Sequence, residues 1–313
     1  HEELVAFHDK WYRPDNCFVF LYGNIPTEEQ LDFLQDNFLD RLEKKYPSAL
    51  DSEENRKAHV AAHLAYVTPA PIAKPIRMYA EGPAGEDEGE KNTVLVNWRF
   101  GTCPDAKTAY EYQVLTGILL NHDGSPLQKA LLDSGLGEDT APQTGLDPSQ
   151  YVCLLTVGLR GVQKGNEEKV QRLIFDTLTD LVKNGIPQND IDSTLMSMEY
   201  SQCEIKRLHG PYALRLMTRP IYAWLYGFDV EKSFRLRETF DEVARKVRTQ
   251  KGYVEQLIQK LLLDNQERSL VVVTPTKKST RERNKAEKKR IADLLKTTSK
   301  EEIKRQKDAL HAF

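Results

Sequence analysis

The sequence has little of what marks a secreted or membrane-bound protein. Its 313 residues include four cysteines, Cys17, Cys103, Cys153 and Cys203, and none of them forms a Cys-x-x-Cys pair. We therefore predict free thiols in a reducing, intracellular compartment. No Asn-x-Ser/Thr glycosylation site is present. No apolar run approaches the roughly 18 residues that a membrane-spanning helix needs, so we predict no membrane partner.

The sequence also lacks complete catalytic motifs. His59 and His63 are four residues apart, the spacing with which zinc peptidases hold a metal ion on a helix, but those motifs also need a carboxylate between the histidines. Val60 and Ala62 stand where that general base would be, so we interpret the pair as linker or surface histidines; adventitious metal binding is the alternative. We predict no metal ligands in this chain.

Two other catalytic or cofactor motifs are missing as well. No Gly-x-Ser-x-Gly nucleophile elbow occurs. The pair Gly135-x-Gly137 is followed by a strand pattern, whereas a dinucleotide-binding loop leads into a helix. Cys153 falls in a predicted apolar strand, and we interpret it as a residue of the hydrophobic core. We therefore predict no catalytic residue here.

The charge is unevenly distributed. The whole chain carries −3, with 40% hydrophobic and 29% charged residues, which is typical of a globular protein. Residues 277–313 carry 13 Lys/Arg and 6 Asp/Glu, a net charge of +7, which leaves −10 on the rest. We interpret this tail as two solvated helices separated at residues 297–299, with Ser299 as a cap, and predict no nucleic-acid partner. An interaction module that binds RNA or lipid through the tail is the alternative.

Hydrophobic periodicity predicts a fold of mixed helices and strands. The predicted strands are residues 17–22, 76–81, 93–100, 151–159 and 269–274, with a strand pair within 139–161. The predicted helices are residues 1–12, 27–45, 108–121, 126–134, 166–184, 187–207, 212–226, 231–247 and 252–263. Residues 1–22 and 252–274 share the order helix, Asn-containing turn, strand, which is weak evidence of a repeat.

A central stretch, residues 124–137, joins helix 108–121 to the strands that follow it. We predict that Gly124 ends the first helix with positive φ, that Ser125 caps the next helix and that Pro126 occupies its first position. Gly135 and Gly137 are predicted to stop that helix. The residues that we assign to this structural motif are Gly124, Ser125, Pro126, Leu127, Ser134, Gly135, Leu136 and Gly137.

Composition divides the chain into four parts: residues 1–46, a Pro-rich linker at 47–75, a second block at 76–276 and the charged tail at 277–313. The sequence opens inside a helical pattern and without Met. We therefore expect a segment of a longer protein, in which residues 1–46 close a domain that lies upstream.

Several short patterns together resemble the insulinase/pitrilysin family of inverted zinc metallopeptidases, in its presequence-protease branch. They cover nearly the whole chain. They are Phe7-His8-x-Lys10-Trp11-Tyr12-x-Pro14-x-Asn16, Asn97-Trp98, Ser125-Pro126-Leu127-x-Lys129-x-Leu131-Leu132-x-Ser134-Gly135-Leu136-Gly137, Gly158-Leu159-x-Gly161-Val162 and Ile221-x-x-Trp224-x-Tyr226.

The resemblance implies a zinc metalloendopeptidase that degrades short unstructured peptides in a chamber closed by two halves. The implied fold is α+β, with a mainly antiparallel sheet that helices cover on one side. Residues 1–46 would end the catalytic domain, 76–276 would be the non-catalytic second domain, and 277–313 would begin a helical hairpin hinge. The HxxEH zinc site would lie upstream of this chain. The implied compartment is the bacterial cytoplasm or the mitochondrial matrix.

The implied partners are the missing catalytic domain, the C-terminal half of the same protein and peptide substrates. Residues 1–46 carry large apolar side chains that the missing domain would cover, so the segment on its own is expected to self-associate. A scaffold subunit from an inactive peptidase homologue is the alternative function.

The missing carboxylate between the two histidines generates the first prediction. The purified chain should bind no stoichiometric zinc and cleave no peptide, because it has no general base beside a metal site. Metal analysis after dialysis and a fluorogenic peptide assay check this. Cleavage that a chelator abolishes would contradict it.

Overall fold

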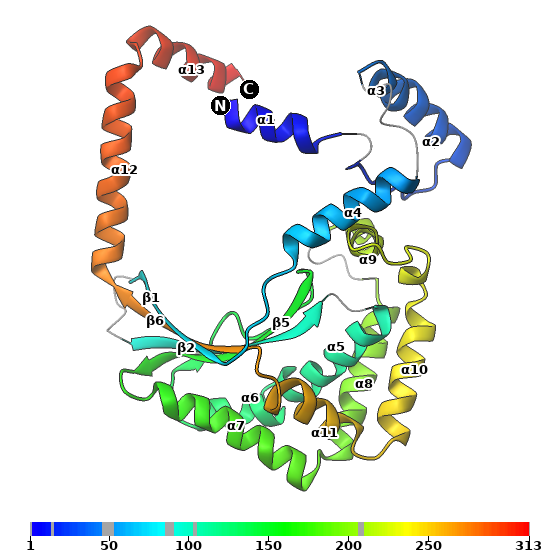
Figure 1. Ribbon diagram of the computed structural model, residues 1–313, viewed down its shortest axis with the longest axis vertical. Coiled ribbons are helices and arrows are strands. Elements are labelled where there is room, and N and C mark those ends of the chain that lie inside the picture. Colours follow the sequence, from blue (N-terminus) through cyan, green and yellow to red (C-terminus); the bar gives the residue numbers. More distant parts are fainter. Residues whose placement is uncertain are drawn as a thin grey trace.

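The computed structural model describes residues 2–13, 16–45, 53–84, 91–102, 105–205 and 210–312. A twisted sheet lies at the centre, with a layer of helices on one side of it (Figure 1). On the other side, α4 (Glu53–Val67), α1 (Glu2–Trp11), α12 (Lys277–Thr297) and α13 (Lys300–Ala312) border an open space in this view. This is the predicted α+β architecture, which is confirmed.

The sheet is mostly antiparallel and has the order β1-β6-β2-β5-β3, with β4 also paired to β5. Its one parallel pair among the described strands joins β1 to β6. The strands are β1 (Ile76–Pro83), β2 (Lys91–Thr102), β3 (Asp139–Thr140), β4 (Gly145–Asp147), β5 (Val152–Gln163) and β6 (Arg268–Thr276).

Strand β2 shows why the sheet has two different faces. Side chains alternate across a strand, and Val94, Val96 and Trp98 point into the core with at most 1% of their surface exposed. The residues between them, such as Leu95 and Asn97, stay partly exposed on the opposite face. One face therefore carries the hydrophobic core, and the other is left without a covering layer of helices.

Helices of residues 106–263 supply the other half of the core. They are α5 (Ala106–Leu120), α6 (Pro126–Asp133), α7 (Glu167–Asn184), α8 (Gln188–Cys203), α9 (Tyr212–Leu225), α10 (Leu236–Thr249) and α11 (Tyr253–Ile258), with the short helices η3 (Lys232–Phe234) and η4 (Gln259–Leu263). The amphipathic α7 buries Val170, Ile174, Leu178 and Leu181 at helical spacing. Gly185, with φ of 83°, ends it as predicted.

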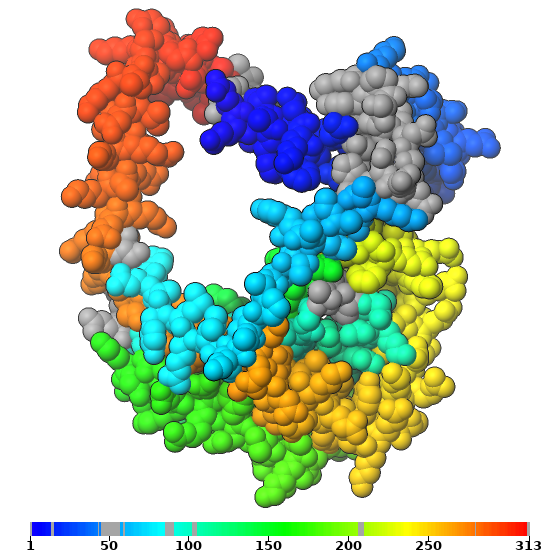
Figure 2. Space-filling view, viewed as in Figure 1, coloured from blue at the N-terminus to red at the C-terminus, as the bar shows by residue number. Residues whose placement is uncertain are grey.

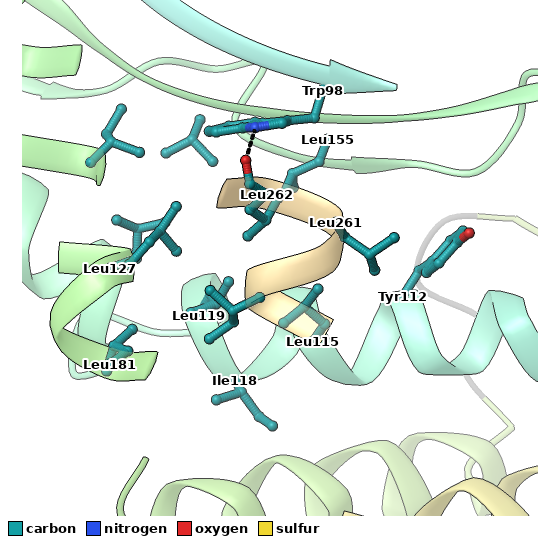
Figure 3. Packing of buried hydrophobic residues seen from close by; sticks show 14 of the residues in the cluster. Trp98, Tyr112, Leu115, Ile118, Leu119, Leu127, Leu155, Leu181, Leu261 and Leu262 are labelled. Carbon is teal, nitrogen blue, oxygen red and sulfur yellow. Dashed lines mark hydrogen bonds between the residues drawn. The ribbon is translucent and has the colours of Figure 1, made fainter. Parts of the chain in front are cut away.

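Trp98 connects the sheet to these helices. Its indole Nε1 donates a hydrogen bond of 3.0 Å to the carbonyl oxygen of Leu262 in η4 (Figure 3). The indole ring also lies 5.9 Å from the ring of Phe175. A π-helical turn such as η4 leaves backbone carbonyls without their usual helical partners, and Trp98 satisfies one of them.

The N-terminal part departs from the prediction at one place. Helix α1 is followed by residues 16–22, which form no strand, and Val19, Leu21 and Tyr22 are 45–60% exposed. The predicted strand is wrong because no strand of the described part of the chain lies beside these residues to complete its hydrogen bonds. The next helix is formed as predicted, in three pieces: α2 (Thr27–Leu34), η2 (Gln35–Leu39) and α3 (Asp40–Lys45).

The predicted linker contains a helix of its own, α4 (Glu53–Val67), which leads through extended residues into β1. At the other end of the chain β6 continues directly into α12 (Lys277–Thr297). The predicted break follows, and the Ser299 hydroxyl accepts a hydrogen bond of 3.1 Å from the Glu302 N–H at the start of α13. Residues 46–52, mostly in the predicted linker, and residues 85–90, between β1 and β2, lie outside the described residues.

The indole hydrogen bond can be tested by substitution. Trp98→Phe should lower the free energy of unfolding by about 1–3 kcal/mol, because it leaves the buried Leu262 carbonyl without a donor. Chemical denaturation measures the change. Tyr200→Phe, at a residue that is 68% exposed on α8, is the matched control and should change stability by less than about 0.5 kcal/mol. Equal stabilities for Trp98→Phe and the control would contradict this role.

Candidate functional site

The open face of the sheet is the candidate functional surface. We call it the open face and define it by rows of residues that lie side by side on β5, β2, β6 and β1. The first row is Thr156, Asn97, Ser269 and Ile76, and the second includes Leu95, Val271 and Met78. The first row is polar in its centre and the second is apolar. Such a surface can offer both hydrogen bonds and apolar contacts to an extended chain.

A chain of hydrogen bonds fixes the polar row. The Thr156 hydroxyl donates to Asn97 Oδ1 at 2.8 Å, and Asn97 Nδ2 donates to the Ser269 hydroxyl oxygen at 3.2 Å. These bonds hold the Asn97 amide in one orientation. Ser269 keeps its own hydroxyl hydrogen available to donate. Asn97 and Trp98 therefore have opposite roles, one on each face of β2.

Arg99 connects the open face to the segment before β1. Its guanidinium donates to Glu267 at 2.9 Å and to the Ala70 carbonyl oxygen at 2.8 Å, and only 14% of its side chain is exposed. The hydrogen bond to Ala70 thus holds the chain that leaves α4 against one end of the open face.

The space-filling view shows a wide hollow beside the sheet (Figure 2). Its boundary is formed by α12, α13, α1, α4 and the strand β1 at the sheet edge. Ile76 and Met78 of β1 are 41% and 53% exposed. Apolar side chains of this edge strand are therefore available to contact another chain.

The central stretch lies on the helix side and joins α5, α6 and β3. Ser125 is 1% exposed, and its hydroxyl oxygen accepts a bond from the His122 N–H at 3.3 Å. Pro126 begins α6, and Leu127 is fully buried. The prediction for Gly124 is wrong: its φ is not positive, because α5 ends four residues earlier, at Leu120.

The second half of this stretch packs against β5. The Ser134 hydroxyl donates to the Leu131 carbonyl oxygen at 2.7 Å and accepts from the Leu136 N–H at 3.1 Å. Gly135 has φ of 63°, so it ends α6 as predicted. A Cβ atom at Gly137 would lie 2.8 Å from the Arg160 carbonyl oxygen, and only glycine permits this close approach.

Two ion pairs hold the chain that follows. Arg160 bonds to Asp139 at 3.0 Å, and Lys91 pairs with Glu138. The bond from Arg160 holds the pKa of Asp139 below its usual range, and Lys91 does the same for Glu138. The exposed Arg160–Asp139 pair stabilises the β3–β5 pairing to a modest extent, and the Lys91–Glu138 pair joins β2 to the residue before β3.

Of the two linker histidines, the structure describes the side chain of His63 alone. His63 lies in α4 and stacks on Tyr226, with ring centroids 6.2 Å apart, and the side chain of His59 is outside the described part of the chain. Among described residues, no group of three or more His, Cys, Asp or Glu could hold a metal ion. The donors present here thus do not fit a resident zinc ion.

The cysteines are distributed over different surroundings. Cys17 and Cys203 are exposed free thiols, and Cys153 is buried in β5 on the helix side, as predicted for a core residue. Cys103 lies outside the described residues. No helix within the described ranges is long and apolar enough to cross a membrane.

Comparison with known proteins agrees with this architecture. Residues 1–198 match the model of the "Peptidase M16 inactive domain". The match covers more than half of the chain, and the chain therefore belongs to the M16 peptidase family as a copy of its inactive domain. The resemblance to insulinase-type peptidases is confirmed.

Individual relatives point to the same branch. The chain is 29% identical to presequence protease 1, chloroplastic/mitochondrial, of Arabidopsis thaliana, over 96% of this chain and 27% of that protein. It is 28% identical to protein HypA of Clostridium perfringens, over 94% of this chain and 28% of that protein. The chain thus spans little more than a quarter of these relatives. A protease from Helicobacter pylori has the same fold, with a TM-score of 0.61 and 16% identity, over 88% of this chain and 59% of that one.

The open face was not predicted from the sequence as a surface, although Asn97 belongs to one of the patterns that carry the family resemblance. Part of this surface could have been found from the sequence. Asn97 and Thr156 are polar residues in two otherwise apolar strands, at alternate positions whose side chains face away from the core. Their assembly into one row depends on strand register, and a single sequence does not reveal which strands pair.

The two glycines of the central stretch can be tested separately. Gly137→Ala should cost about 1–3 kcal/mol of stability, because the methyl group meets the backbone of β5. Gly135→Ala should cost about 1 kcal/mol, because only the left-handed backbone conformation opposes it. Thermal unfolding measures both.

Asparagine distinguishes the two causes. Gly135→Asn should recover part of the loss seen with alanine, since Asn tolerates positive φ. Gly137→Asn should be at least as harmful as Gly137→Ala. If the Asn variant is more stable than the Ala variant at position 137 as well as at position 135, close packing against β5 is not the reason why position 137 needs glycine.

Proposed function

We propose that this chain is the non-catalytic second domain of a zinc metalloendopeptidase, together with the end of the catalytic domain and the start of the hinge. The observation that carries the proposal is the open face: a sheet with one uncovered side, a fixed polar row and an exposed edge strand beside a hollow. In this role the open face lines the chamber in which short unstructured peptides are held and degraded.

The division of the chain follows from the same proposal. Residues 1–46 end the catalytic domain, 47–75 are the linker, 76–276 form the second domain and 277–313 begin the helical hairpin. The zinc ligands and general base belong to an upstream part of the longer protein, and the eight residues of the central stretch have a structural role. The size of the relatives supports this, since the chain spans only 27–28% of those compared above.

The N-terminal segment supports the proposed partner domain. Leu4, Phe7 and Phe33 are 56–69% exposed. Such a group of exposed large apolar side chains is unusual on the surface of a protein whose domains are all present. We propose that the catalytic domain covers them in the longer protein, and that segments prepared without it associate with one another. The chloroplast and mitochondrial location in the name of the Arabidopsis relative supports an intracellular, reducing compartment.

A photo-crosslinking experiment tests the proposed chamber role. A photoreactive phenylalanine analogue is placed at Leu95, in the second row of the open face, in the longer protein with its catalytic glutamate replaced so that peptides are bound but not cleaved. The matched control places the same analogue at Lys183, which is exposed near the end of α7 on the helix side. We expect an unstructured test peptide of about ten residues (roughly 33–36 Å when fully extended, which is comparable to the diameter of a small domain) to crosslink at Leu95 and not at Lys183.

The parent enzyme is assayed in parallel. Peptide cleavage that a chelator abolishes is expected from the protein with its glutamate intact. Equal crosslinking at the two positions, or crosslinking at Lys183 alone, would contradict the chamber role of the open face. Absence of chelator-sensitive cleavage would favour the scaffold function instead.

A further inference from the structure

A second hollow lies on the helix side of the sheet, away from the open face. This cavity has a volume of about 1070 Å³ and is lined by residues of α5, α8, α9 and α10, with Cys153 of β5 at its inner end. The volume is at the upper end of the range of ligand pockets, which is about 300–1,000 Å³. The cavity is therefore large enough for more than a single small ion.

Helix α9 turns a cationic face toward this cavity. Arg215, Arg219 and Tyr222 all line it, and their spacing of four and three residues puts them on one side of the helix. The inward side of a helix packed on a protein is normally apolar. Here Leu214 is 53% exposed instead, while the two arginines are partly buried.

The two guanidinium groups make no ion pair with any described residue. The carboxylates that line the cavity are engaged elsewhere. Asp105 accepts bonds from the N–H groups of Lys107 and Thr108, and Glu242 pairs with Lys107. Asp229 accepts from the N–H groups of Glu231 and Lys232, which lower its pKa and keep it ionised. The remaining lining carboxylate, Glu238, is exposed.

The other lining residues suit an organic ligand. Tyr110, Met198 and Phe228 provide apolar and aromatic surface, and Gln113, Ser201 and Gln202 provide uncharged hydrogen-bonding groups. Burial raises the pKa of Tyr110, and the positive charge of Arg219 opposes that rise, so the phenol and the guanidinium share one space. Arginine forks match carboxylates in a bidentate geometry. The amide and hydroxyl side chains of the lining can form hydrogen bonds with the N–H and C=O groups of a peptide backbone.

We propose that this cavity binds a short peptide segment through a carboxylate held by Arg215 and Arg219, with an apolar side chain of that segment packed against Tyr222 and Phe228. The carboxylate comes from an acidic side chain or from a peptide C-terminus. The site is separate from the open face and needs no catalytic domain.

Isothermal titration of the whole chain with three hexapeptides tests the proposal. The first is blocked at both ends and contains two Phe and two Glu; the second has Gln in place of Glu; the third has Gln and a free C-terminal carboxylate. The Glu peptide should bind about tenfold or more tightly than the blocked Gln peptide. Only the Glu peptide supplies a negatively charged partner for the two arginines. Tighter binding of the third peptide than of the first identifies the C-terminus as the source of the carboxylate.

Variants assign the binding to α9. The double variant R215Q/R219Q should weaken binding of the preferred peptide about tenfold or more, and R281Q, which removes an exposed arginine of α12, should leave it unchanged. R215K/R219K keeps the charge and should give an intermediate affinity. Circular dichroism shows whether R215Q/R219Q is folded. If it is unfolded, the affinity of R215K/R219K for the peptide tests the role of the arginines instead.

Several results would overturn the proposal. They are failure of both carboxylate-bearing peptides to bind, equal affinity for the blocked Gln peptide, or affinity that neither arginine variant changes. Inorganic phosphate that competes with the peptide at equal affinity would also overturn it, since the cavity would then be a site for small anions. These outcomes leave the proposed chamber role unaffected, because the titration involves neither the open face nor proteolysis.

Discussion

The alternation of side chains along β2 is the constraint on which the rest of the structure depends. Because Val94, Val96 and Trp98 enter the core, Leu95, Asn97 and Arg99 must face the other way. The indole of Trp98 then secures the arrangement by bonding to the Leu262 carbonyl, which attaches the helical layer to this face. The opposite face stays uncovered, and its polar row lies beside the hollow. A shift of β2 by one residue would exchange the two faces and remove both the core and the candidate surface.

Most of the fold could be predicted from the sequence because local signals agreed with the final packing. The apolar stripe of α7, the break before α13 and the stop at Gly135 depend on spacing, capping and backbone freedom, which are visible within a few residues. Gly124 was assigned a positive φ from its position after a helix, but α5 ends earlier and the chain turns through His122 instead. The open face and the cavity beside α9 depend on which strands and helices meet, and that information is not local.

The wrong prediction for residues 17–22 is informative, because a similar sequence succeeds elsewhere in the chain. Both places have a helix, a turn with an asparagine and an apolar run. The amide of Asn16 donates to the Trp11 carbonyl oxygen at 3.0 Å, and that of Asn265 donates to the Leu261 carbonyl oxygen at 3.0 Å. After Asn265 the run forms β6, since β1 and β2 lie on either side of it. After Asn16 no described strand is adjacent, so the same kind of sequence forms no strand and leaves Val19, Leu21 and Tyr22 exposed. The proposed catalytic domain would supply the missing sheet.

Thiol labelling of Cys17 tests this account most directly. Cys17 begins the exposed run, and Cys203 at the end of α8 is an exposed internal reference on the helix side. The chain and the longer protein are treated with iodoacetamide, and each cysteine is quantified by mass spectrometry. We expect the two thiols to react at similar rates in the chain, and Cys17 to become about tenfold or more slower in the longer protein while Cys203 is unchanged, because a covered strand opens only by local unfolding. Equal reactivity of Cys17 in both proteins would contradict the assignment of residues 1–46 to a catalytic domain that lies outside this chain.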